Sequence, residues 1–223
     1  MLVWDAPVRV FHWLMVISFA GAYLTAESER WRMLHVSLGY TMAGLVAFRI
    51  VWGLIGTRHA RFSDFVRGPS AIATYVGAML RGEPKRHVGH NPVGALAIIA
   101  LLGLTLAIAA SGWAVFNGVG GEWLEETHEL AANAMLAIVG IHIAGVMLAS
   151  RFGRENLVGA MFTGRKAGLP DDGVRSAWRS VAMLMLAAVI GFWWLQWQAP
   201  PIAAGASDQT QGRATSHEDR DDD

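Results

Sequence analysis

The stretch "HELAANAMLAIVGIH", residues 128–142, has a histidine at each end and an almost wholly apolar middle. On an α-helix, fourteen residues turn through roughly 1,400°, about 40° short of four full turns, so both imidazoles lie near one stripe. A rise of 1.5 Å per residue separates them along the axis by about 21 Å. Because the hydrocarbon core of a bilayer is about 30 Å thick, a membrane-spanning helix would hold one imidazole near each side.

The composition of the whole chain is that of a membrane protein, since 53% of its 223 residues are hydrophobic and only 16% are charged. Apolar stretches long enough to span a bilayer occur at 10–26, 35–56, 92–114, 128–149 and 181–197. The first lacks a basic n-region and a clear small-residue cleavage site, so we interpret it as a retained span rather than a signal peptide. The sequence therefore predicts an all-α integral membrane protein.

Positive charge is concentrated in alternate loops. Segments 57–91 and 150–180 each contain six Lys or Arg residues, and Arg9 lies near the N-terminus, whereas the other loops and the tail contain four in all. This positive-inside pattern predicts a cytoplasmic N-terminus and a C-terminal tail on the far side of the membrane. Topology explains the basic loops better than nucleic-acid binding does, so no nucleic-acid partner is expected. The absence of cysteine excludes disulfides, iron–sulfur clusters and covalently attached c-type haem.

Two loop features and the tail complete the organisation. The stretch "RFSDFVRGPSAIATYVGAMLRG", residues 61–82, has the apolar spacing of a short amphipathic helix on the inner surface. Asn91 and Pro92 are typical N-cap and first-turn residues for the third span. Residues 199–223 are small, polar and acidic, and we expect them to be disordered.

The histidines of the spans fall into two pairs when they are sorted by depth. Topology places His12 and His142 near the inner side of the membrane, and His35 and His128 near the outer side. A single histidine in a membrane is more often hydrogen-bonded core, but two matched pairs are what two non-covalent b haems with bis-histidine ligation require. A zinc protease is a poor alternative, because position 132 of the H-E-x-x-H pattern is Ala132.

Further candidate contacts lie toward the inner side. Arg49 follows His35 by fourteen residues, on nearly the same stripe, and suits a haem propionate or a quinone oxygen. A snorkelling or helix-capping arginine is an equally good interpretation. In the basic loop, His59 and Arg61 are also candidates for a propionate or quinone contact, although a solvated loop histidine is the more usual role for His59, His87 and His90.

Four stretches together resemble the prokaryotic cytochrome b561 family, which includes the membrane cytochrome b subunits of nickel–iron hydrogenase and formate dehydrogenase. They are "VWDAPVRVFHWLMVISFAGAYLT" (3–25), "LHVSLGYTMAGLVAFRIVWGLIGTRHARFSDFVRGP" (34–69), "GHNPVGA" (89–95) and "THELAANAMLAIVGIHIAGV" (127–146). The resemblance covers about residues 1–168. It implies four core helices and haem iron ligation by His12, His35, His128 and His142. It also implies electron transfer between quinone and a periplasmic partner, which would be a c-type cytochrome or a dehydrogenase or hydrogenase subunit.

These observations predict a four-helix haem-binding bundle with a fifth transmembrane helix. We expect a di-haem cytochrome b domain at 1–168, a linker and fifth transmembrane helix at 169–198, and a tail at 199–223. The expected function is electron transfer between a periplasmic redox partner and the quinone pool, as an electron-transfer subunit of an oxidoreductase. The alternatives are a stand-alone superoxide:quinone oxidoreductase, a haem-free proton-coupled transporter that uses the histidines, and a structural anchor for another enzyme.

Overall fold

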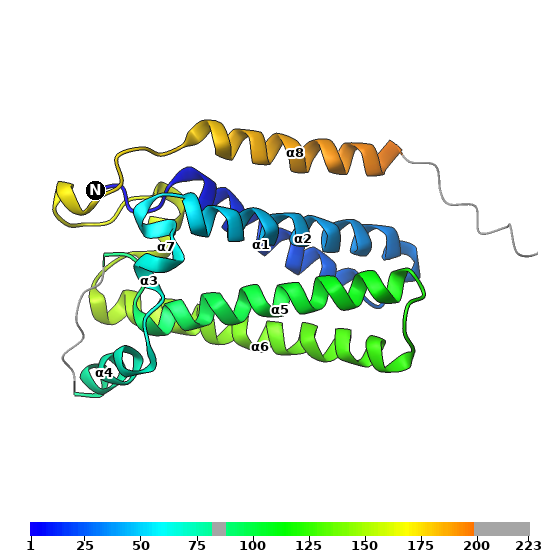
Figure 1. The fold of residues 1–223 in the computed structure, drawn as a ribbon, viewed down its shortest axis with the longest axis horizontal. Coiled ribbons are helices and arrows are strands. Elements are labelled where there is room, and N and C mark those ends of the chain that lie inside the picture. The colour runs from blue at the N-terminus through cyan, green and yellow to red at the C-terminus, as the bar shows by residue number, and fades with distance from the viewer. Residues whose placement is uncertain (82–87, 199–223) are drawn as a thin grey trace, which may run out of the picture. The chain divides into compact units, whose positions relative to one another are not determined.

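The computed structural model describes residues 1–81 and 88–198, so His87 and the acidic tail lie outside the described residues. The described part is helical (Figure 1). Its long helices are α1 (Ala6–Thr25), α2 (Arg32–Ile55), α5 (Pro92–Phe116), α6 (Glu122–Gly153) and α8 (Arg179–Gln198). Within the described residues, these 5 helices are long and apolar enough to cross a membrane. The prediction of an all-α integral membrane protein is confirmed.

Shorter elements occupy the loops. They are η1 (Glu29–Trp31), η2 (Arg58–Ala60), α3 (Phe62–Phe65), α4 (Pro69–Leu80), α7 (Leu157–Thr163) and η3 (Pro170–Asp172). The amphipathic helix predicted within 61–82 is α4. Internal contacts divide the chain into Met1–Val189 and Ile190–Asp223, with the division inside α8. The predicted boundaries at 168 and 198 stay predictions.

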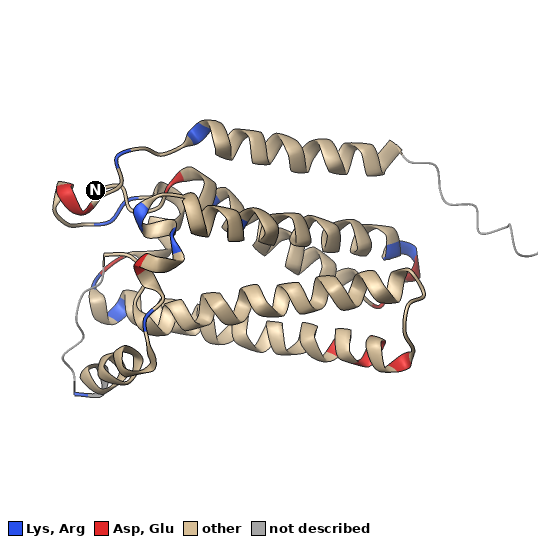
Figure 2. Ribbon diagram, viewed as in Figure 1, with Lys and Arg blue, Asp and Glu red and all other residues tan. Residues whose placement is uncertain are grey.

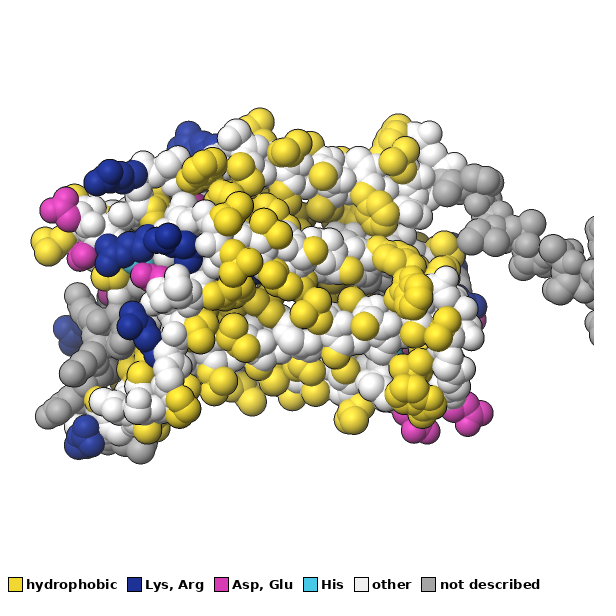
Figure 3. All heavy atoms as spheres, in the orientation of Figure 1, with side chains coloured by type: hydrophobic (Ala, Val, Ile, Leu, Met, Phe, Trp, Pro, Cys, Tyr) yellow, Lys and Arg dark blue, Asp and Glu magenta, His cyan; other side chains and the backbone are white. Residues whose placement is uncertain are grey.

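Helices α1, α2, α5 and α6 form the bundle of the first unit. Helix α1 packs on α2, α5 packs on α6, and α2 also contacts α5 (Figure 1). Buried Leu14, Leu45 and Met185 form one of the clusters between the helices. Hydrophobic side chains cover much of the long-helix surface in Figure 3. In α6, only 6% of an apolar 18-residue stretch is buried within the protein. An apolar outer surface is what contact with lipid requires.

The two ends of the bundle differ in charge. Lys and Arg gather at the end where α1 begins, whereas Glu residues mark the end where α6 begins (Figure 2). We call the first the basic end, formed by residues 1–12, 49–81, 88–91 and 142–178. The second is the acidic end, formed by residues 22–35 and 108–128. The positive-inside prediction assigns the basic end to the cytoplasm, and that assignment stays a prediction.

Buried Asp5 joins the start of α1 to the end of α2. Its Oδ1 accepts a hydrogen bond of 2.8 Å from the Val8 amide, which caps α1. Its Oδ2 accepts from Trp52 Nε1 at 3.0 Å and from Thr57 Oγ1 at 2.7 Å. Asp5 is only 1% exposed, so these donors replace the water that a carboxylate needs.

The first residues of the chain close the basic end by backbone pairing with a segment far along the sequence. The amides of Val3 and Trp4 donate to the Gly164 carbonyl at 2.8 and 3.0 Å, and the Val174 amide donates to the Leu2 carbonyl at 2.8 Å. Gly164 has a φ of +76°, and a Cβ there would lie 2.5 Å from the Trp4 carbonyl oxygen. This position therefore requires glycine.

Candidate haem-binding sites

The acidic end brings together His35, in the first turn of α2, and His128, in the second turn of α6. Their ring centroids are 6.1 Å apart, with an angle of 72° between the ring planes. The pairing expected from membrane depth is therefore present in the structure as a close pair of rings from two different helices.

Backbone carbonyls fix the orientation of both rings. His35 Nδ1 lies 2.8 Å from the Ala22 carbonyl oxygen in α1. His128 Nδ1 lies 3.1 Å from the Ile108 carbonyl oxygen and 3.1 Å from Ser111 Oγ in α5. A carbonyl only accepts, so in each ring Nδ1 carries the proton and Nε2 keeps its lone pair. This is the tautomer that a metal-binding histidine needs, and such an outer hydrogen bond is its usual support.

These dimensions fit one metal ion between the rings. A metal–nitrogen bond of about 2 Å on each side, plus about 1 Å from each nitrogen to its ring centre, gives a centroid separation of roughly 6 Å. The observed separation is 6.1 Å. Together with the free Nε2 lone pairs, it is compatible with axial ligation of a haem iron by both imidazoles.

Ser111 and Gly112 in α5 support the His128 ring, and sequence reasoning missed both. Ser111 Oγ donates to the Ala107 carbonyl at 2.8 Å and is therefore free to accept from His128 Nδ1. A Cβ at position 112 would lie 2.8 Å from His128 Cε1, so the ring occupies the space that glycine leaves. The signal in the sequence was a small polar residue beside a glycine within an apolar span.

The basic end holds His12 in α1 and His142 in α6. The two side chains lie near enough for their charges to interact. His12 also packs edge-on against Trp13, with ring centroids 5.1 Å apart. His12 Nδ1 is buried and has no hydrogen-bond partner among the described residues. This pair therefore lacks, at His12, the carbonyl support of the acidic-end pair.

Comparison with known proteins identifies the family of the chain. Residues 3–164 match the family model described as prokaryotic cytochrome b561. The chain belongs to this family. A b-type haem is accordingly its cofactor, and electron transfer in a bacterial membrane is its general role. The candidate ligands all lie within the matched residues.

Several relatives carry one name, "Probable Ni/Fe-hydrogenase B-type cytochrome subunit". The protein from Rhodobacter capsulatus is 25% identical, across 76% of this chain and 82% of its own length. The protein from Rhizobium leguminosarum bv. viciae is 23% identical, across 74% of this chain and 87% of its own. The protein from Cupriavidus necator is 25% identical, across 73% and 85%. No solved structure matches this chain.

Arg49, which the sequence predicts as a contact for a propionate or a quinone, is deeply buried. It is 3% exposed, and its guanidinium carbon lies 4.9 Å from the centre of the Phe62 ring. Its Nη1 has no hydrogen-bond partner among the described residues. This burial argues against a snorkelling arginine, since the charged end of such a residue reaches water. Arg61, in contrast, is exposed where α3 begins, and its predicted role in cofactor binding stays a prediction.

The expectation of solvated loop histidines is wrong for His59, which is 4% exposed. Its Nδ1 lies 3.0 Å from Asp64 Oδ2, and its Nε2 lies 2.8 Å from the Asp172 carbonyl oxygen. The ring therefore ties the loop after α2 to the segment before α8. Two residues from distant loops meet here, and sequence periodicity says nothing about such a contact.

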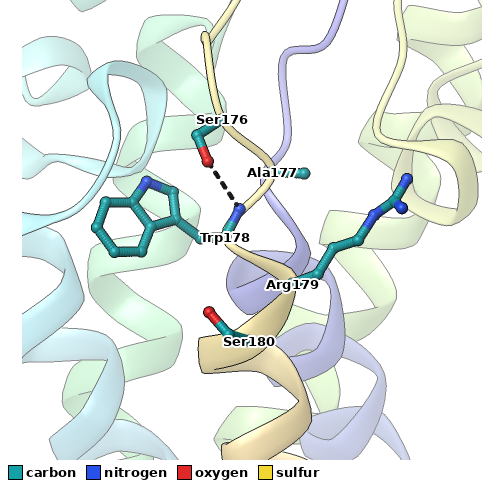
Figure 4. A pocket seen from close by; sticks show the side chains of 5 residues that line it. All are labelled: Ser176, Ala177, Trp178, Arg179 and Ser180. Atoms are coloured by element: carbon teal, nitrogen blue, oxygen red, sulfur yellow. Dashed lines mark hydrogen bonds between the residues drawn. The ribbon is translucent and has the colours of Figure 1, made fainter.

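Two surface hollows accompany these sites. A cleft of about 520 Å³ lies beside α4, with His59, Asp64, Tyr75 and His90 among the residues that line it. A second, shallower pocket lies at the start of α8 (Figure 4). It is lined by Ser176, Ala177, Trp178, Arg179 and Ser180, none of which is a candidate haem ligand.

Proposed function

We propose that this chain is a di-haem b-type cytochrome that carries electrons across the membrane. In this proposal His35 and His128 hold one haem at the acidic end, and His12 and His142 hold the other at the basic end. Electrons pass between a periplasmic redox partner at the acidic end and the quinone pool at the basic end. The four-helix domain at 1–168 carries this function, with the N-terminus in the cytoplasm and the tail in the periplasm.

The observation that carries the proposal is the arrangement of His35 and His128. Their ring centroids are 6.1 Å apart, with 72° between the ring planes, and each Nδ1 is held by a backbone carbonyl. Because Nδ1 carries the proton in both rings, each Nε2 keeps the lone pair that a metal ligand needs. The same helix α6 supplies a second imidazole about 21 Å farther along its axis, at the spacing of fourteen residues.

The proposed ligand pairs favour electron transfer as the chemistry of this chain. When bound, a b haem supplies a reversible one-electron carrier. Two imidazole ligands leave the iron no open position, which disfavours oxygen chemistry at the metal. The carbonyls of Ala22 and Ile108 keep each imidazole in the metal-binding tautomer and in a fixed orientation. The same residues serve electron flow in either direction.

The names of the relatives support one class of partner. Because several similar proteins are named as hydrogenase B-type cytochrome subunits, we propose a hydrogenase or a related dehydrogenase subunit as the periplasmic electron donor. A c-type cytochrome is the other partner that we expect. Quinone is the proposed substrate at the basic end, where Arg49 and Arg61 are the candidate contacts for its oxygens or for a haem propionate.

The test is a haem count on the detergent-purified full chain, by pyridine haemochrome and by reduced-minus-oxidised spectra. We expect about two b haems per chain. His35→Ala should remove mainly the acidic-end haem and His142→Ala mainly the basic-end haem, while His217→Ala in the tail serves as the matched control. Two haems that survive both substitutions would overturn the ligand assignment. A folded chain without haem, after a confirmed haem supply, would favour the transporter hypothesis instead.

A further inference from the structure

Several buried hydrogen-bonding groups at the basic end have no partner among the described residues, and two of them lie beside Phe65. These two are Arg49 Nη1 and His90 Nδ1. Arg49 lies within α2 and is only 3% exposed, whereas His90 lies just before α5. Burying a guanidinium away from water is costly unless an anion accompanies it. The basic end therefore has a cation and a second polar group that no described residue satisfies.

Phe65 lies beside both groups. The Arg49 guanidinium carbon lies 6.0 Å from the centre of the Phe65 ring. The His90 ring lies 4.7 Å from Phe65 and 4.4 Å from Trp4, measured between ring centroids. Aromatic side chains therefore flank both polar groups, and we call these four residues the Arg49–His90 cluster.

Three carboxylates at this end, those of Asp5, Asp64 and Glu155, already interact with other donors. Asp5 accepts from Val8, Trp52 and Thr57. Asp64 pairs with the His59 ring at 3.0 Å, and Glu155 pairs with Lys166 at 3.1 Å. Asp5 still attracts Arg49 electrostatically, but its oxygens hold other donors. None of these three carboxylates accepts a hydrogen bond from Arg49 or His90, which leaves both groups able to bind the carboxylate of a ligand.

His90 also interacts electrostatically with His142 of the basic-end histidine pair. Burial, followed by the positive charge of Arg49 and then by Lys166, His142 and His59, lowers the pKa of His90 to about 3. His90 is thus a neutral imidazole that can donate one hydrogen bond, beside a guanidinium that carries a full charge. This combination suits a carboxylate, which accepts from both kinds of donor.

We propose that Arg49 and His90 form the carboxylate-binding site for the propionates of the haem held by His12 and His142. The inference rests on the proposed function and adds His90 as a residue that binds this haem. Arg49 supplies the charge and His90 a neutral donor. Both are positioning residues, because they contact the edge of the cofactor and leave the iron to the ligand pair.

The charge on Arg49 has a measurable consequence. Reduction adds one negative charge to the haem centre, and a nearby cation stabilises the reduced state. Arg49→Gln should therefore lower the midpoint potential of the basic-end haem and leave the acidic-end haem unchanged. We expect about a tenfold change in the equilibrium constant for reduction, which is about 59 mV for one electron. Arg49→Lys, which keeps the charge, should restore most of the potential.

The experiment compares the full-length holoprotein with Arg49→Gln, Arg49→Lys, His90→Gln and Arg151→Gln, in detergent. Arg151 is exposed at the last turn of α6. Its substitution removes the same charge outside the Arg49–His90 cluster and is therefore the matched control. Redox titration measures both haems. Resonance Raman spectra report the propionate bending bands, which respond to hydrogen bonding and would not respond to a merely structural role. His90→Gln should shift these bands with a smaller change of potential than Arg49→Gln.

The outcomes separate this inference from the proposed function. Two bound haems with unchanged potentials and unchanged propionate bands in Arg49→Gln and His90→Gln would overturn the carboxylate site and leave the di-haem proposal intact. A wild-type chain with a single haem held by His35 and His128 would overturn both. If Arg49→Gln loses the basic-end haem alone and Arg49→Lys retains it, the carboxylate site is supported. If Arg49→Gln loses both haems, the bands of His90→Gln decide.

Discussion

The acidic and basic ends hold their histidine pairs in different ways. At the acidic end, His35 and His128 each donate through Nδ1 to a carbonyl of a neighbouring helix. At the basic end, His12 Nδ1 is buried without a described partner, and so are nearby groups of Arg49 and His90. The acidic-end imidazoles are therefore oriented by the backbone itself. The basic end has buried polar groups without a partner among the described residues, so under our proposal its order depends more on the bound haem.

Among substitutions outside the four candidate histidine ligands, we expect the largest effect at Asp5. This residue organises the basic end through its contacts with Val8, Trp52 and Thr57. Asp5→Ala removes the cap of α1 and leaves Trp52 Nε1 and Thr57 Oγ1 without their acceptor. We expect a loss of about 2–4 kcal/mol in the free energy of unfolding, from the lost cap and the unsatisfied donors. Thermal unfolding of the detergent-solubilised protein measures it, with exposed Asp171→Ala as the control. If Asp5→Ala retained the basic-end haem as firmly as the acidic-end haem, the proposed difference in order between the two ends would be wrong.

A smaller effect, confined to the acidic end, is expected at Gly112. The Cβ of Gly112→Ala would lie 2.8 Å from His128 Cε1 and displace the ring. Overpacking of this kind costs about 1–3 kcal/mol, so we expect weaker binding of the acidic-end haem. Haem retention during dilution in detergent, followed by the spectra of each haem, measures the change.

Gly103→Ala is the matched control for Gly112→Ala. Both glycines lie in α5, but a Cβ at position 103 meets nothing within 4 Å. Haem retention in Gly103→Ala should equal that of the wild type. Equal losses in the two variants would mean that helix α5 tolerates neither change and that the His128 contact is not the cause.

The smallest effect is expected at Ser111, which tests how much of the support for His128 comes from the backbone. Ser111→Ala removes one of the two groups near His128 Nδ1 and leaves the Ile108 carbonyl in place at 3.1 Å. The expected change in acidic-end haem affinity is at most about 1 kcal/mol, the usual net contribution of one hydrogen bond. A competitive haem-transfer assay measures it. Loss of the acidic-end haem would show that the hydroxyl, rather than the carbonyl, orients the ring.

The sequence predicted what depends on helix period and membrane depth. The spans, the Asn91 cap, the α4 helix and the proximity of His35 to His128 follow from spacing and from the distribution of charge. Arg49 was expected at the depth of the basic end for the same reason. The ligand roles of the four histidines, and the role of Arg61, stay predictions until haem is measured.

The features that the sequence did not reveal arise from contacts between distant segments. His59 meets the Asp172 carbonyl, 113 residues away, and His128 meets the Ile108 carbonyl and Ser111 in α5. Periodicity assigns a residue to a face of its own helix, but it does not identify the atom that this face meets on another segment. The buried state of His59 and the support of His128 are properties of packing, so they required the structure.

The pairing of residues 2–4 with residues 164 and 174 also determines an order of events during biosynthesis. Leu2, Val3 and Trp4 leave the ribosome before their partners Gly164 and Val174, which are made more than 150 residues later. At 5–20 residues per second, the wait is roughly 8–30 s. By then the helices that carry His35 and His128 have all been synthesised. The acidic end can therefore assemble in the membrane while the basic end is still open, and the basic-end haem that we propose would have that interval in which to enter.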